Sequence, residues 1–150
     1  MNVQSAASRQ ARVAPATNFT GSVFQDPLAR AEGPSKTNAT TVTFVPGART
    51  VWHKHDMRQV LVVTTGLGIL QVRGRPAEAL RPGDVATVPP GIDHWHGASA
   101  NALFAHISLL ESAPEGTGWG EAVTEGDYRQ ANTARLIPIS GPHRLCSMFK

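Results

Sequence analysis

Cysteine is nearly absent from this chain of 150 residues, in which Cys146 stands alone. A single cysteine cannot form an internal disulfide, and its isolation fits a reducing compartment. Long apolar runs are also missing, so we expect no bilayer-spanning helix, and residues 1–18 have no apolar core of the kind found in secretory signals. These absences together predict a cytoplasmic protein with no membrane partner.

Basic residues exceed acidic ones only near the two ends of the chain. The net charge is +3, and six of the 14 basic residues lie in residues 1–18 and 129–150, where no acidic residue occurs. The other eight bases share residues 19–128 with all 11 acidic residues. Because nucleic-acid binding needs a basic patch or stripe, we expect no nucleic-acid partner. We expect residues 1–18 to be a mobile N-terminal extension and residues 129–150 a flexible C-terminal tail.

Short segments rich in β-branched residues follow one another between Phe19 and Leu110, and glycine and proline separate them. The clearest are TTVTFV (40–45), QVLVVTTG (59–66), GILQV (68–72), DVATVP (84–89) and ALFAHISLL (102–110). Turn signals such as Pro46-Gly47 and Pro82-Gly83 lie between them. Many short strands with this punctuation predict an all-β sandwich or barrel. We also expect a short helix around residues 125–130.

Five of the six histidines lie between residues 53 and 106. His53 and His55 are two residues apart, so on a strand their side chains point to the same face. His94 and His96 repeat this arrangement in a second segment. Taken alone, such a pair is more often surface decoration than a metal site.

His106 lies in the last long predicted strand. The residues that alternate with it are Phe104, Ser108 and Leu110. The polarity of this set suggests that its face of the strand looks into a cavity. A single histidine of this kind is more often a core residue than a functional one, so only the combined pattern of histidines points to a site.

Two blocks of fixed spacing connect these histidines. The first is Gly47-x5-His53-x-His55-x3-Gln59-x6-Gly66, and the second is Gly83-x5-Pro89-x-Gly91-x2-His94. This spacing resembles the two signature motifs of the cupin family, in which Glu is usual at the position of Gln59 and Asn at that of Ala98. The resemblance implies a single cupin β-barrel, a double-stranded β-helix or jelly roll, over residues 19–128.

The resemblance also implies that His53, His55, Gln59 and His94 hold one divalent transition metal per chain. Mn or Fe is expected first, with Zn, Co and Ni as alternatives. Three imidazoles and one amide oxygen suit these ions and leave coordination positions open for substrate or water. Gln in place of Glu removes one negative charge, which should make the ion a stronger Lewis acid and hold it less tightly. Some cupins have lost their metal and serve as storage or binding proteins, which is the alternative.

Longer stretches resemble a group of small single-domain bacterial cupins that includes metal-dependent hydroxynitrile lyases. Among them are TFVPGART (43–50), WHKH (52–55) and PGIDHWHGA (90–98). This resemblance implies a lyase that cleaves or forms a C–C bond to cyanide, and a homo-oligomer such as a dimer or tetramer. His106, together with His96, would take the proton of the substrate hydroxyl.

Strand parity gives weaker candidates for the wall of the substrate pocket, for which plain core packing is the alternative. They are Thr40, Val42, Phe44, Phe104 and Leu110.

Two other functions fit the same pattern. An Fe or Mn cupin dioxygenase, or a related decarboxylase or dehydratase, would share the metal ligands and differ in whether the metal must change oxidation state. A non-catalytic cupin that binds a small molecule is the other. The additional histidines His96 and His106 favour proton chemistry over simple binding.

Overall fold

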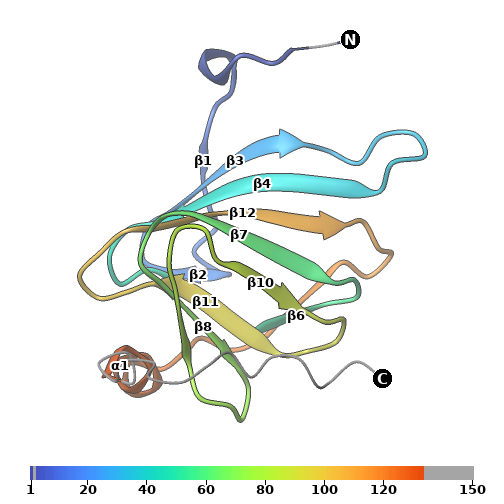
Figure 1. The fold of residues 1–150 in the computed structure, drawn as a ribbon. Coiled ribbons are helices and arrows are strands. Elements are labelled where there is room, and N and C mark those ends of the chain that lie inside the picture. The colour runs from blue at the N-terminus through green and yellow to red at the C-terminus, as the bar shows by residue number, and fades with distance from the viewer. Residues whose placement is uncertain (2, 134–150) are drawn as a thin grey trace.

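Two antiparallel sheets make up most of the structure, a computed structural model that describes residues 1 and 3–133. The first sheet forms the upper layer in Figure 1 and the second lies below it. The all-β barrel predicted from the sequence is therefore confirmed. Cys146 and the other residues from 134 to 150, which belong to the expected C-terminal tail, lie outside the described residues.

The first sheet has six strands, and the second is built around β11. The order in the first is β1 (Arg12–Val13), β3 (Val23–Ala29), β4 (Thr37–Phe44), β12 (Phe104–Glu111), β7 (Gln59–Gly66) and β10 (Val85–Val88). The order in the second is β13 (Thr117–Trp119), β6 (His53–His55), β11 (His94–Ala98), β5 (Arg49–Thr50) and β2 (Phe19–Thr20). On the same sheet β8 (Gly68–Val72) pairs with β11 and with β9 (Glu78–Leu80).

Two helices complete the described part of the chain, the 3-10 helix η1 (Ala6–Ser8) and the α-helix α1 (Glu125–Thr133). The α-helix confirms the predicted helical segment and extends it by one turn into the expected tail. Neither helix is long and apolar enough to cross a membrane, and no other helix occurs among the described residues.

The first sheet begins earlier than the sequence predicts. We expect the barrel to start at Phe19, but β1 pairs with β3 through Arg12 and Val13. Ala14 is 8% exposed and belongs to the core. Pro27 lies within β3 at a position beyond the end of β1. On that side of β3 the described part of the chain has no strand to accept a hydrogen bond, so the lack of an N–H at Pro27 does not interrupt the sheet.

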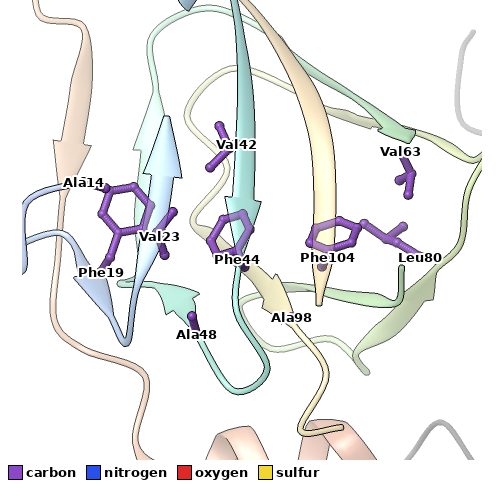
Figure 2. Packing of buried hydrophobic residues seen from close by; sticks show 10 residues of the cluster. All are labelled: Ala14, Phe19, Val23, Val42, Phe44, Ala48, Val63, Leu80, Ala98 and Phe104. Atoms are coloured by element: carbon purple, nitrogen blue, oxygen red, sulfur yellow. The ribbon is translucent and has the colours of Figure 1, made fainter. Parts of the chain in front are cut away.

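Large side chains on β4 and β12 fill one end of the barrel, whereas the other end is hollow. The two strands pair in register, with Phe104 opposite Phe44 and His106 opposite Val42. The two phenylalanine rings lie 5.9 Å apart and are fully buried (Figure 2). Towards the other end the inward-facing residues become smaller and more polar, so the strands there enclose a cavity rather than a packed core.

The helix α1 covers the outer face of the second sheet. Trp95 of β11 is fully buried there and packs against Tyr128 with the ring centroids 6.0 Å apart. The guanidinium of Arg49 lies 4.3 Å from the centre of the Tyr128 ring and donates to Glu125 Oε1 at 2.6 Å. The Tyr128 hydroxyl donates to the carbonyl of Ala98 at 2.8 Å. These contacts attach the helix to the strand that carries two of the histidines.

Gly66 should be far less tolerant of substitution than Gly74, although both have positive φ values of 78° and 76°. A Cβ at Gly66 would collide with the backbone of Leu103, whereas nothing lies within 4 Å of a Cβ at Gly74. We expect Gly74→Ala to lower the free energy of unfolding by about 1–2 kcal/mol through backbone strain. Gly66→Ala should cost a further ~1–3 kcal/mol from overpacking. Urea denaturation of both variants measures the difference, and equal losses would contradict the close approach at Gly66.

Candidate metal centre and pocket

Three buried histidines from two neighbouring strands converge in the barrel. His53 of β6 pairs in register with His94 of β11, and their ring centroids are 4.2 Å apart. One ligand nitrogen each of His53, His94 and His96 lies within 4.8 Å of the others. Such spacing suits a single metal ion. Two of these histidines belong to the predicted ligand set, while the sequence assigned His96 a role as a base.

Hydrogen bonds to the ring Nδ1 atoms leave the Nε2 lone pairs of two histidines available. His53 Nδ1 lies 2.9 Å from the carbonyl of Val51, and His94 Nδ1 lies 2.8 Å from the carbonyl of Ile92. A carbonyl only accepts, so in each neutral ring the proton is on Nδ1 and Nε2 carries the lone pair. Metal-ligating histidines are commonly fixed in this way.

His55, the last residue of β6, also has a partner at Nδ1. Its Nδ1 lies 2.9 Å from Thr117 Oγ1 of β13. Its Nε2 is buried and makes no hydrogen bond of normal geometry within the described structure. Buried polar atoms rarely lack a partner, so this nitrogen fits a metal ligand.

Gln59, the fourth predicted ligand, reaches the cluster from the start of β7. Its side chain is buried, and its Oε1 lies 3.1 Å from His94 Nε2. Its Nε2 donates to Ser108 Oγ at 3.1 Å. With the proton of His94 on Nδ1, both the amide oxygen and His94 Nε2 present lone pairs to each other. Two acceptors at this separation repel unless a cation lies near both, so the donor set fits a bound metal ion.

Burial keeps the imidazoles uncharged at neutral pH. Desolvation, followed by the neighbouring His94 ring, lowers the pKa of His55 to about 4. Desolvation lowers the pKa of His106 to about 3. The pKa values of His53 and His96 are lowered well below the usual value by burial first and by neighbouring histidines second. Neutral imidazoles can offer lone pairs to a metal or accept a proton.

His106 lies beside His96 and is fully buried. The two ring centroids are 4.9 Å apart, and neither ring nitrogen of His106 makes a hydrogen bond of normal geometry in the described part of the chain. The ring of Phe44 packs against both histidines, with centroid distances of 5.7 and 5.8 Å. Phe44 thus packs against two imidazoles that each have a buried nitrogen without a hydrogen bond of normal geometry to any described residue.

A cavity of about 190 Å³ opens above these histidines. Three of the five predicted wall residues line it: Thr40, Val42 and Leu110. Phe44 and Phe104 do not line it, which corrects their assignment to the wall. They face inward as strand parity predicts, but they lie at the closed end of the barrel and pack in the core.

Several lining residues carry no signal in the sequence that would mark them. Trp119 and Thr117 belong to β13, a strand of three residues, and Phe19 belongs to β2, a strand of two. Neither strand is long enough to show a period of two. Trp119 lies 5.1 Å from His53 and 5.9 Å from Phe19, measured between ring centroids. These two rings form an aromatic wall beside the histidine cluster.

Comparison with known proteins gives consistent matches. A family model described as a cupin domain matches residues 40–106. A (R)-mandelonitrile lyase from Granulicella tundricola is 40% identical over 131 residues, which are 87% of this chain and 100% of that protein. A crystal structure of a cupin-like protein from Thermotoga maritima is 41% identical and has a TM-score of 0.77 over 79% of this chain and 91% of that one.

A more distant structure shares the fold alone. The polyketide cyclase RemF from Streptomyces resistomycificus is 15% identical, with a TM-score of 0.69 over 89% of this chain and 97% of that one.

Acid should destabilise the metal-free protein. The pKa of His106 is about 3 in the folded protein against 6.5 for an ordinary histidine, so between these values the unfolded chain binds more protons and stability falls as pH falls. The loss of unfolding free energy that His106 causes sets in as the pH falls below about 6.5. It amounts to about 2 kcal/mol between pH 7 and pH 5. Urea denaturation at both pH values measures this loss. His106→Gln should reduce the loss by about that amount, and an unchanged pH dependence would count against the lowered pKa.

Proposed function

Since this chain belongs to the cupin family, we propose that it is a metal-dependent lyase that cleaves or forms the C–C bond of an aryl cyanohydrin. The observation that carries this proposal is the cluster of neutral histidines beneath a cavity with an aromatic wall. The 40% identity to a (R)-mandelonitrile lyase supports the choice of substrate.

The proposed metal ligands are His53, His55, Gln59 and His94, with Mn or Fe as the ion. The buried Nε2 of His55, which makes no hydrogen bond of normal geometry among the described residues, and the facing lone pairs of His94 and Gln59 support this set. A bound divalent ion would act as a Lewis acid that makes the substrate hydroxyl more acidic.

His106 and His96 are the proposed bases. Both are neutral at pH 7 because burial lowers their pKa values. One of them accepts the hydroxyl proton, the electron pair of the O–H bond forms the carbonyl, and the C–C bond electrons leave with cyanide. The proton then passes from the imidazolium to cyanide, which gives aldehyde and hydrogen cyanide. An imidazolium of low pKa releases its proton readily, so the base is restored for the next turnover.

Metal content is the first test, with two matched variants. Protein purified without chelator should contain about one Mn or Fe per chain by elemental analysis. His94→Ala should lose the metal, while His96→Ala should keep it and lose most cleavage of (R)-mandelonitrile. Loss of metal in both variants would instead assign His96 to the ligand set, as its position in the cluster allows. Folded wild-type protein that binds no metal would contradict the proposal.

Oxidative chemistry is the second candidate because an Fe or Mn oxygenase could use the same donors. The metal of a lyase need not change its oxidation state, so Zn(II)-substituted protein should keep cyanohydrin cleavage. Oxygen uptake that Zn(II) abolishes, without any cleavage, would favour the oxidative function.

Trp119 should contribute to recognition of the aryl group. Its side chain is 43% exposed and lines the cavity beside Phe19. Because aromatic pairs add binding energy beyond the area they bury, Trp119→Leu should raise KM for (R)-mandelonitrile about 2–10-fold. Steady-state kinetics on an aliphatic cyanohydrin serve as the control, for which we expect a smaller change. An equal change for both substrates would show that Trp119 does not select the aryl group.

A further inference from the structure

We propose that Ser108 is a positioning residue: by accepting a hydrogen bond from the NH2 group of Gln59, it allows the oxygen of that side chain to face the metal. This inference rests on the proposed metal-dependent function and deepens it. It addresses a problem that arises because residue 59 is a glutamine and not a glutamate.

The two ends of a glutamine amide are chemically different. The oxygen has lone pairs that can bind a metal, whereas the NH2 group only donates hydrogen bonds. A half-turn about the last side-chain bond exchanges the two ends in nearly the same volume. A glutamate has no such ambiguity because both of its ends are oxygens. When its oxygen binds a metal, a buried glutamine therefore needs a neighbour that accepts a hydrogen bond from its NH2 group.

Ser108 is placed to supply that acceptor. It lies on β12 and faces the cavity two residues from His106. Its Oγ accepts a hydrogen bond from Gln59 Nε2 at 3.1 Å, while Gln59 Oε1 lies 3.1 Å from His94 Nε2. The Gln59 side chain is 4% exposed, so water cannot easily replace this bond.

The reversed amide is the competing state. In that orientation Gln59 Nε2 would donate to the lone pair of His94 Nε2, and the Ser108 hydroxyl would donate to Gln59 Oε1. A hydroxyl both donates and accepts, so Ser108 can satisfy either orientation. The metal then decides between them, because only the first orientation presents an oxygen to it.

Removal of the Ser108 hydroxyl affects the two orientations of the Gln59 amide unequally. With alanine at position 108, the reversed amide keeps its bond to His94 and leaves only a carbonyl oxygen without a donor, a defect that buried structure tolerates better than an unpaired N–H. The metal-binding orientation instead leaves a buried NH2 group without an acceptor, which is costly. Ser108→Ala should therefore weaken metal binding by favouring the wrong end of the amide, while the fold stays intact.

The test is the Mn(II) affinity of the full chain, measured by competition with a chelator. Ser108→Ala should lower the affinity about 10–100-fold, the range typical for partners of metal ligands. Ser108→Thr should restore it, and Ser108→Val, which matches threonine in volume, should not. Ser112→Ala is the control, because that hydroxyl accepts from Asn38 at 2.8 Å and contacts no proposed ligand.

A double-mutant cycle separates positioning from general support of the pocket. In a Gln59→Glu background the loss of the Ser108 hydroxyl should change the Mn(II) affinity less than about 3-fold, because either carboxylate oxygen can bind the ion. Thermal unfolding of each metal-free variant shows whether it is folded. If Ser108→Ala does not fold, the threonine and valine variants provide the same comparison.

Two results would overturn the inference: an unchanged affinity in Ser108→Ala, or an equal loss in the wild-type and Gln59→Glu backgrounds. Neither would affect the proposed function as long as the wild-type chain binds Mn(II). Wild-type protein that is folded and does not bind Mn(II) or Fe(II) would overturn both.

Discussion

The burial of uncharged imidazole rings is the constraint on which the rest of the structure depends. Five histidines lie inside a barrel whose core is otherwise largely aliphatic and aromatic. Charged imidazoles would be too costly there, so the rings are neutral and each needs either a partner or a ligand. Backbone carbonyls near β6 and β11 and the hydroxyl of Thr117 supply partners on one side of three rings. The nitrogens left over on the inner side make up the site.

The sequence predicts those parts of the fold that depend on local pattern. The bounds of β7 and β8 agree with the predicted strands at residues 59–66 and 68–72. Runs of apolar and β-branched residues that are bounded by glycine mark such strands clearly. The resemblance of the histidine and glycine spacing to the cupin motifs implies the barrel and the meeting of the histidines inside it. The polarity of the residues that alternate with His106 correctly places Ser108 and Leu110 at the cavity.

Depth along the barrel and pairing with short strands could not be predicted. Strand parity shows that Phe44 faces inward, but it does not show whether an inward residue lies in the packed end or in the hollow end. Thr117 is 62 residues from the histidine that it contacts and lies in a strand of three residues. Only the folded chain brings such residues to the site, and Trp119 enters the pocket wall in the same way.

The contacts of Arg49 bear on how the molecule unfolds. Its guanidinium is almost completely buried and bonds to the carbonyl of Val123 and to Glu125, far away in the sequence. If α1 and the segment before it came away from the barrel, the guanidinium would lose Val123 and Glu125 and keep its bond to the carbonyl of Gly47. Local opening of the helix is therefore expensive, and helix and barrel form one cooperative unit. A chain cut before Val123 would lose more than a surface helix, since Arg49 would no longer have the two acceptors and the aromatic ring that it contacts there.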